Sequence, residues 1–393
     1  MTHVAMYAHQ AFYLPILQPI YDVLCGKAEC LLTGNRREVV AFRPNVVVMA
    51  SHTPLGYFRE RLPGAVFVNI RHGLINKLAG SGSLAHRKST YVFDAICIGA
   101  RSAVDPFRRA GMEPAEFWWT GYPQMDPLFR GDPPPDLPLD TAGKTVLYAP
   151  TWNPGLSSAP VIGPQLVDRI REGVPGVNII IKPHPVIRER QPRWITWWRH
   201  MAKKESGVYL VEDLDANLMP YMLYSDLLIS DASSAIFEFL ALDRPIVLMT
   251  NPQHRWDPAY DCRDIVWRWR DVGDEIHDPA ELPGAVAEAI NNPEKYGECR
   301  RRYADMLFGS MTDGCNHVRV AEKVLAAGKK VAKFGARRNT GRDGERNLAG
   351  WFWTGLRARL GTSTILRKLR FGPWGTANLW LRERIVCARP FSD

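Results

Sequence analysis

Three segments of the sequence combine basic and hydroxyl side chains that could bind and transfer a phosphate group. The first, "IRHGLINK", places His72 and Gly73 directly after an apolar run and Lys77 a few residues further on. Histidine titrates near neutral pH and can act as a general base, while lysine can balance the charge of a phosphate. A histidine that only makes structural hydrogen bonds within a loop would show the same sequence pattern, so this segment alone leaves both interpretations open.

The second segment, "IIIKPHP", holds Lys182 and His184 on a turn that contains two prolines. Proline cannot continue a central strand, so the chain must leave a sheet at this point on a stiff turn. Two side chains that can carry positive charge on such a turn suit a phosphate group. An ordinary strand end is the alternative interpretation.

The third segment, "SDLLISDASSAIFEFLALDRPIVLM", predicts a strand, a sharp turn, a helix to about Leu242 and a second buried strand. Asp231, Ser233 and Ser234 follow the first strand, and open α/β sheets bind ligands at the carboxyl ends of their strands. The first amides of a helix are unpaired donors that favour an anion. The segment therefore predicts a phosphate site, although capping of the helix by Ser233 needs no ligand.

A fourth segment, "YAPTWN", places Thr151 and Trp152 after another predicted strand. Several widespread catalytic patterns are missing from the sequence: G-x-x-x-x-G-K-[ST], G-x-G-x-x-G, G-x-S-x-G and H-E-x-x-H. Their absence disfavours P-loop kinases, dinucleotide enzymes of the fingerprint type and zinc proteases.

Short apolar strands alternate with helical stretches along most of the chain, which predicts an α/β fold with parallel sheets. A stretch rich in Pro, Asp and Gly separates two such series and is typical of a linker. We therefore expect two Rossmann-like domains that face a cleft, with the four segments at strand ends on that cleft. The predicted boundaries are 1–126, a linker at 127–143, a second domain at 144–327 and a basic extension at 328–393.

The positive charge of the 393-residue chain is concentrated in this extension. Residues 328–393 contain 15 Lys and Arg against 4 Asp and Glu, a net charge of +11, so the rest of the chain carries −2 of the total of +9. Trp351, Phe352 and Trp353 precede arginines in the same region. Aromatic and cationic side chains together predict a segment that lies on an anionic membrane surface. An extension packed on the protein core is the alternative.

The sequence also carries information on the location of the protein. No apolar run reaches the roughly 18 residues of a membrane-spanning helix, and the N-terminus does not have the pattern of a secretory signal. The seven cysteines are scattered without a C-x-x-C pair, which disfavours a disulfide framework or a zinc knuckle. We expect a cytoplasmic protein, peripheral at the inner face of the cell membrane, that binds no nucleic acid.

Taken in order, these segments resemble the CDP-glycerol glycerophosphotransferase family, of the teichoic-acid polymerase and primase type. The motifs of that family are H-G-x-P-x-K, G-x-P-x-x-D, Y-A-P-T-W, a basic P-H-P turn, D-x-S-S before a helix, and a late D-G. The corresponding positions here are His72–Lys77, Gly121–Asp126, Tyr148–Trp152, Lys182–Pro185, Asp231–Ser234 and Asp313–Gly314. The resemblance therefore extends over residues 72–325 and does not reach the basic extension.

The resemblance implies a GT-B fold whose first domain binds the acceptor and whose second domain binds the nucleotide. It implies transfer of glycerol phosphate from CDP-glycerol to a hydroxyl of a lipid-linked or glycan acceptor, with release of CMP, in the synthesis of a cell-envelope polymer. His72 is then the general base, Ser233 and Ser234 hold the pyrophosphate of the donor, and Glu238 reaches the ribose. The implied catalytic residues are His72, Lys77 and His184, and the implied substrate-binding residues are Gly73, Thr151, Trp152, Lys182, Asp231, Ser233, Ser234 and Glu238.

Departures from the family pattern at Arg71, Ile75 and Ala232 leave the nucleobase and the alcohol of the donor open, so CDP-ribitol is an alternative donor. A GT-B glycosyltransferase or a sugar-nucleotide 2-epimerase is a second hypothesis, because the fold and the strand-end phosphate site are shared. A non-enzymatic binding protein with a basic tail is a third. The sequence predicts no cofactor and leaves the use of a divalent metal ion open.

Overall fold

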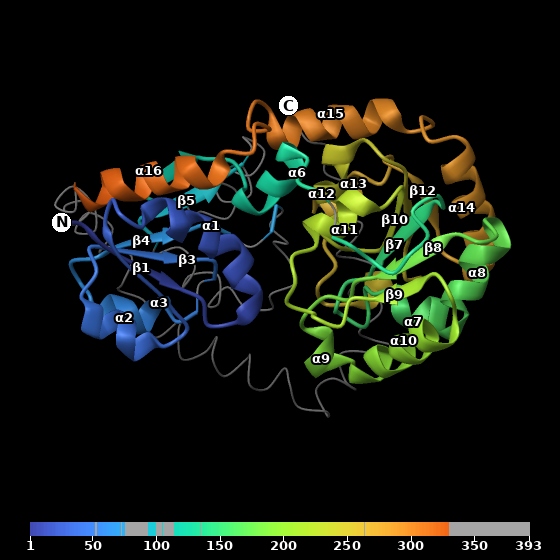
Figure 1. The fold of residues 1–393 in the computed structure, drawn as a ribbon, viewed down its shortest axis with the longest axis horizontal. Helices are drawn as coiled ribbons and strands as arrows, with labels where there is room; N and C mark the ends of the chain where they lie inside the picture. The colour runs from blue at the N-terminus through green and yellow to red at the C-terminus, as the bar shows by residue number, and fades with distance from the viewer. Residues whose placement is uncertain are drawn as a thin grey trace, which may run out of the picture.

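The structure of the chain is a computed structural model that describes residues 1–51, 53–71, 73–74, 93–99, 104, 114–133, 135–262 and 264–329. Two domains lie side by side in Figure 1, and each is built around a parallel sheet of six strands flanked by helices. The predicted α/β class with two Rossmann-like domains is confirmed.

The first domain has the strand order β2-β1-β3-β4-β5-β6. Its strands are β1 (His3–Tyr7), β2 (Glu29–Thr33), β3 (Val46–Met49), β4 (Val66–Asn69), β5 (Ala95–Ile98) and β6 (Glu116–Trp119). Its described helices before the linker are η1 (Ala11–Tyr13), α1 (Leu14–Leu24), α2 (Arg36–Phe42) and α3 (Leu55–Arg61). The central strands are apolar and buried along their whole length, because helices cover both faces of the sheet.

The second domain has the strand order β12-β11-β10-β7-β8-β9. Its strands are β7 (Thr145–Ala149), β8 (Asn178–Ile181), β9 (Val208–Leu210), β10 (Leu227–Ser230), β11 (Ile246–Met249) and β12 (Asp274–Ile276). Its helices include α7 (Ala159–Ile162), α8 (Leu166–Gly173), α9 (Ile187–Arg190), α10 (Pro192–Lys204), α11 (Met219–Tyr224), α12 (Ala235–Phe239), α13 (Ile265–Arg268), α14 (Leu282–Asn291) and α15 (Gly297–Phe308). The helix predicted to end near Leu242 is α12 extended by the 3-10 turn η5 (Leu240–Leu242), and Asp243 ends it in a left-handed conformation.

The last described helix, α16 (Asn316–Gly328), returns to the first domain, although the predicted second domain extends to residue 327. Val320, Ala321 and Val324 of this helix belong to the same buried cluster as Ile16 and Leu17 of α1. Figure 1 shows α16 alongside α1 over the first sheet, while α15 lies over the second. The apolar stripe of α16 matches that of α1, so the second domain ends before residue 316.

The two crossings between the domains are fastened to each other by the short helix α6 (Asp126–Arg130). The Asp126 carboxylate, which is 2% exposed, accepts hydrogen bonds from Asn316 N at 3.0 Å and from both His317 N at 2.8 Å and His317 Nδ1 at 2.6 Å. Gly121 has a φ of +74°, and a β-carbon there would overlap the amide of Asn316. Arg130 Nη1 of α6 also donates to the carbonyl oxygen of Gly314 at 3.1 Å, so the G-x-P-x-x-D and D-G motifs fix the junction between the domains.

Each sheet has a point where the strand order reverses direction. In the first domain that point lies between β1 and β3, and in the second it lies between β7 and β10. Loops that leave neighbouring strands in opposite directions open a crevice at the carboxyl edge, where open α/β sheets bind ligands. In the second domain the segments "APTWN" and "DASS" leave these two strands.

The predicted basic extension lies outside the described residues from position 330 onward. Among the helices that the structure describes, none combines the length and apolar character needed to cross a bilayer. Five cysteines of this part of the chain are free, namely Cys25, Cys30, Cys97, Cys299 and Cys315.

Candidate active site

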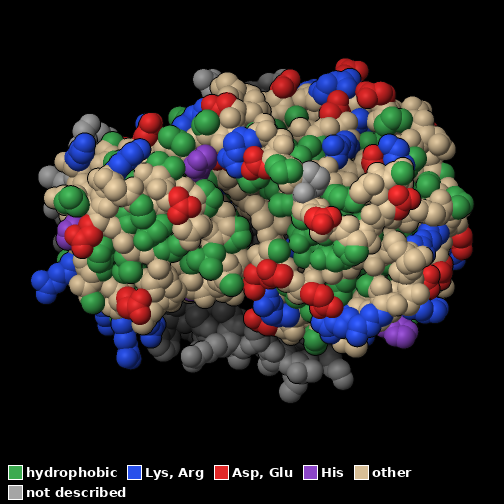
Figure 2. All heavy atoms as spheres, in the orientation of Figure 1, with side chains coloured by type: hydrophobic (Ala, Val, Ile, Leu, Met, Phe, Trp, Pro, Cys, Tyr) green, Lys and Arg blue, Asp and Glu red, His purple; other side chains and the backbone are tan. Residues whose placement is uncertain are grey.

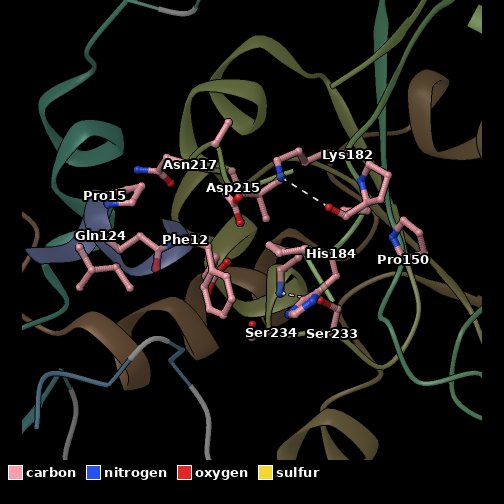
Figure 3. A pocket seen from close by; sticks show the side chains of 18 residues that line it. Phe12, Pro15, Gln124, Pro150, Lys182, His184, Asp215, Asn217, Ser233 and Ser234 are labelled. Carbon is pink, nitrogen blue, oxygen red and sulfur yellow. Dashed lines mark hydrogen bonds between the residues drawn. The ribbon is translucent and has the colours of Figure 1, made fainter. Parts of the chain in front are cut away.

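A pocket lies between the two domains at the reversal point of the second sheet. It encloses about 120 Å³, enough for several water-sized groups. Phe12, Pro15, Ile16 and Gln124 line it from the first domain, and Figure 3 shows Phe12, Pro15 and Gln124 across from Lys182, His184, Ser233 and Ser234 of the second. The space-filling view in Figure 2 shows the furrow between the two domains.

The carboxylate of Asp231 joins the two loops at the reversal point. Its Oδ1 accepts hydrogen bonds from Thr151 N at 2.9 Å and Ala232 N at 2.8 Å, and its Oδ2 accepts from Ser158 N at 2.8 Å and Ser158 Oγ at 2.9 Å. The residue is 1% exposed, and burial raises its pKa while these four hydrogen bonds act in the opposite direction. Asp231 therefore shapes the loops, and all four of these donors belong to the protein.

Ser233 and Ser234 lie directly after this anchor, half-buried on the wall of the pocket. Ser233 Oγ accepts the amide of Ala235 at 3.3 Å, whereas the N-cap residue of α12 is Ser234, whose side chain makes no capping hydrogen bond. The predicted capping of the helix by Ser233 is therefore not what the structure shows. Arg270 donates a hydrogen bond from Nη1 to the carbonyl oxygen of Asp231 at 2.8 Å and another from Nε to the Glu275 carboxylate at 3.0 Å. The two serines are thus presented by a braced loop.

The P-H-P turn after β8 brings Lys182 and His184 to the same pocket. Lys182 is 5% exposed and donates from Nζ to the carbonyl oxygen of Leu214 at 2.8 Å, and burial lowers its pKa to about 8. His184 Nδ1 accepts the amide of Val186 at 3.2 Å. In the neutral ring the proton is then on Nε2, so this nitrogen is the donor. Both residues can therefore direct N–H groups toward an anion.

The Y-A-P-T-W segment forms the rim beside this turn. Thr151 is buried, and its amide is held by Asp231. The centre of the Trp152 ring lies 6.4 Å from that of the His184 ring. The backbone carbonyl oxygen of Trp152 accepts a hydrogen bond from Gln191 Nε2 at 2.8 Å. Of these two predicted substrate-binding residues, Trp152 is the one whose side chain approaches His184.

The first domain contributes the loop that follows β4. Arg71 and Gly73 are described in this loop, whereas His72 and Lys77 lie outside the described residues. A β-carbon at Gly73 would lie 3.9 Å from Ser234 Oγ, so this glycine faces the serine across the domain boundary. Gly73 and Ser234, which are 161 residues apart in the sequence, are thereby brought together.

Glu238 lies one turn of α12 beyond Ser234 and also lines the pocket. It is 4% exposed, and burial raises its pKa to about 7, opposed by hydrogen bonds with the hydroxyls of Ser234 and Tyr122. The sequence predicts that Glu238 reaches the ribose of the donor, and the structure adds a second set of partners for the same carboxyl group.

Several residues at the site were not predicted from the sequence. Phe12 follows β1, Gln124 lies within the junction motif, and Arg270 is distant in sequence from the loop that it braces. For Phe12 the available signal is its place just after the first predicted strand, since loops at strand ends form such sites. The contribution of Arg270 depends on a contact over 39 residues, which no local pattern reveals.

Within the described part of the chain, no three His, Cys, Asp or Glu side chains are grouped so that they could hold a metal ion. Hydroxyl, imidazole and ammonium donors converge on the pocket, which Asp215 and Glu238 also line. Such donors suit an anionic ligand.

Two parallel α/β domains with a pocket between them at the strand ends have the architecture of the GT-B class. Residues 31–326 match the family described as CDP-Glycerol:Poly(glycerophosphate) glycerophosphotransferase. The chain belongs to this family, which confirms the resemblance found in the sequence.

Relatives and solved structures agree with this assignment. The teichoic acid glycerol-phosphate primase of Bacillus subtilis (strain 168) is 26% identical over 164 residues, which are 40% of this chain and 40% of the primase. The match thus spans two fifths of the length of that relative. A variant of the wall teichoic acid polymerase TagF has a TM-score of 0.65 at 16% identity, covering 84% of this chain and 90% of that one.

The GT-B fold is shared more widely. UDP-GlcNAc 2-epimerase from Neisseria meningitidis, bound to UDP-GlcNAc, has a TM-score of 0.53 at 13% identity and covers 83% of this chain and 100% of its own. Similarity at this level shows the fold alone, so the chemistry must be argued from the site.

Proposed function

We propose that the protein transfers glycerol phosphate, or a related polyol phosphate, from a CDP-activated donor to a hydroxyl of a lipid-linked or glycan acceptor. CMP is released, and the product belongs to a cell-envelope polymer. The observation that carries this proposal is the pocket in which Ser233, Ser234, Lys182 and His184 converge opposite Gly73. Membership of the glycerophosphotransferase family supports it, and a TagF structure soaked with CDPG has a TM-score of 0.61 to this chain.

The proposed reaction is a displacement at the β-phosphorus of the donor. The oxygen of the acceptor hydroxyl forms a new bond to this phosphorus, and the bond to the oxygen that bridges the two phosphates breaks. CMP departs with the electron pair of that bond, and the hydroxyl proton passes to His72. Such a reaction depends mainly on positioning and on stabilising charge at the equatorial oxygens.

The second domain supplies the stabilising charge in this proposal. The hydroxyls of Ser233 and Ser234 and the Nε2–H of His184 donate to the diphosphate, and Lys182 supplies positive charge close by. With a pKa of about 8, Lys182 is largely protonated at pH 7, and a bound diphosphate favours the protonated form further. Lys77 is assigned to the same charge balance from the first domain on the basis of its motif.

A donor panel tests the proposed function directly. Purified protein is incubated with CDP-glycerol, CDP-ribitol and UDP-activated sugars in the presence of a glycan acceptor, and release of CMP or UDP is measured. We expect CMP from a CDP-activated alcohol. Release of UDP from a sugar nucleotide, or its epimerisation, would instead assign the site to the glycosyl chemistry of other GT-B proteins. Adding EDTA to the same reaction decides whether a divalent metal ion takes part.

Donor binding should weaken when the diphosphate ligands are removed. Replacing Ser234 or His184 with alanine is expected to raise the Kd of CDP-glycerol about 10- to 100-fold, because a hydrogen bond to a charged group contributes about 1.5–3 kcal/mol. The Kd of CMP should change less, since CMP lacks the β-phosphate. Titration calorimetry with both ligands measures the difference.

Exposed residues of the same types serve as controls for this experiment. Ser206→Ala and His200→Ala change solvent-exposed side chains of the second domain outside the pocket and should leave both Kd values unchanged. Equal weakening of CDP-glycerol and CMP in the Ser234 and His184 variants would place these residues near the nucleoside and contradict the proposed diphosphate contacts.

We also propose that residues 328–393 hold the protein on an anionic membrane, where a lipid-linked acceptor is found. The full chain should sediment with vesicles that contain acidic phospholipid at low salt and should be released as the salt concentration rises. A chain shortened to residues 1–327 should remain in the supernatant and still bind CDP-glycerol. Equal sedimentation of the two chains would show that the described domains carry the membrane contact.

A further inference from the structure

A buried polar contact crosses the boundary between the two domains directly beneath the pocket. Tyr122 comes from the loop after β6 of the first domain, and Glu238 comes from α12 of the second. They are 5% and 4% exposed. The ring of Tyr122 packs in the hydrophobic cluster of the second domain with Ala232, Ala235 and Ile236, so this side chain is inserted into the neighbouring domain.

The polar groups of these two residues lie in a continuous chain. The Tyr122 hydroxyl donates a hydrogen bond to Gln124 Oε1 at 2.6 Å, and the Glu238 carboxyl group lies within hydrogen-bonding reach of the hydroxyls of Ser234 and Tyr122. Ser234, Glu238 and Gln124 all line the pocket, and Figure 3 shows Gln124 and Ser234 on its opposite sides. The chain therefore links the serine of the proposed diphosphate site to the first domain.

The same place receives the loop that follows β4. Gly73 faces Ser234, and Leu74 packs against the cluster that contains Tyr122. Gly73 and Leu74 thus lie beside the serine and the cluster that this polar bridge of Tyr122 and Glu238 connects.

We propose that Tyr122 and Glu238 are positioning residues that hold Gly73 and Leu74 of the first domain in register with Ser234 of the second. Burying a carboxyl and a phenol hydroxyl is costly unless both are hydrogen-bonded, so the pair fixes one arrangement of the domains better than an apolar contact would. The role assigned to the bridge rests on the proposed function, because it aligns the acceptor side of the cleft with the donor diphosphate. A misplacement of about 1 Å between reacting groups can lower a rate about 100-fold.

Replacing Tyr122 with phenylalanine tests this role, because the change removes one oxygen atom and keeps the packed ring. We expect kcat for CMP release to fall about 10- to 100-fold, with the Kd of CDP-glycerol within twofold of the unchanged protein. Glu238→Ala should behave in the same way, whereas Glu238→Gln keeps a hydrogen-bonding side chain and should recover most of the rate. Tyr296→Phe, which removes a hydroxyl bonded to Asp274 at the far edge of the second domain, is the matched control.

A second readout does not depend on activity. Hydrogen–deuterium exchange of peptides that contain Gly73 and Leu74 should become faster in the Tyr122→Phe protein and remain unchanged in the Tyr296→Phe protein. If the unchanged protein releases no CMP, the proposed function fails, and the exchange measurement still decides whether the bridge holds the loop.

Two outcomes would overturn the bridge. One is a Tyr122→Phe protein that retains more than half its kcat with unaltered exchange. The other is weakening of CDP-glycerol and CMP to the same extent by Glu238→Ala but not by Tyr122→Phe, which would identify Glu238 as a ribose ligand instead.

Discussion

Replacing His72 with alanine is expected to lower the rate of transfer by about 10²–10⁴-fold while leaving the affinity for CDP-glycerol nearly unchanged. A general base contributes only when the acceptor hydroxyl reacts, so its loss affects the chemical step. The residues that we propose as donor ligands, Ser233, Ser234, Lys182 and His184, all belong to the second domain. The placement of Gly73 opposite Ser234 supports this division, because residue 72 precedes that glycine in the chain.

Steady-state CMP release and calorimetry on the same preparation measure the two effects separately. His72→Gln is the matching conservative variant, which keeps a polar side chain but cannot accept the proton at neutral pH. His200→Ala, at an exposed position of α10, controls for the loss of a histidine as such. A His72→Ala protein that keeps more than half of its turnover would show that another group removes the proton.

The strands in the sheet interiors were predictable because they are continuous apolar runs. β3, β4, β7, β8 and β10 are buried at every position, and that composition is visible in the sequence. Three of the four edge strands, β2, β6 and β12, are partly exposed and mix charged with apolar residues, so they carry no comparable signal. An edge strand is stabilised largely by contacts with the neighbouring strand, and a local sequence pattern does not show those contacts.

The packing of α16 illustrates the same limit for domain boundaries. The apolar stripe of α16 can be recognised in the sequence, but it does not show which domain the helix packs against. The answer depends on α1, some 300 residues away, whose Ile16 and Leu17 offer a matching surface. The GT-B crossing is thus set by a pairing of distant helices, and a boundary drawn from sequence alone misses it.

The candidate site was predictable to the extent that its residues follow strands. Ser233, Ser234, Lys182 and His184 stand at strand ends and do line one pocket. What the sequence did not indicate is which polar side chains act through other residues. Gly121 and Asp126 belong to family motifs yet fasten the domain junction, and Asp231 is surrounded by donors of its own chain.

Replacing Asp231 with alanine should destabilise the second domain by about 3–5 kcal/mol. The change leaves the buried amides of Thr151, Ser158 and Ala232 without their acceptor, and an unpaired buried donor costs about 1–3 kcal/mol. Entry of water offsets part of that cost, which is why the expected loss is smaller than the sum. Against a typical total of about 5–15 kcal/mol, the loss is a large fraction of the free energy of unfolding.

Thermal and urea unfolding of the full chain measure this loss, and two variants define its origin. Asp231→Asn keeps one carbonyl oxygen for two of the donors but turns an amide toward Ser158, so about half of the destabilisation should remain. Asp226→Asn is the matched control, because Asp226 also accepts a backbone amide, that of Thr145 at 2.9 Å, but its side chain is 37% exposed. We expect the control to lose less than about 1 kcal/mol, as for exposed polar contacts.

Donor binding should respond in the same order as stability. Because Asp231 sets the positions of Thr151 and of the turn that presents Ser233, the Asp231→Asn protein should bind CDP-glycerol about tenfold more weakly at a temperature where it is fully folded. An Asp231→Ala protein that unfolds no earlier than Asp226→Asn would show that the loops do not depend on this carboxylate. Normal stability combined with lost donor binding would instead indicate that Asp231 contacts the substrate directly. A residue that acts only by shaping the loops should lower stability whenever its replacement weakens binding.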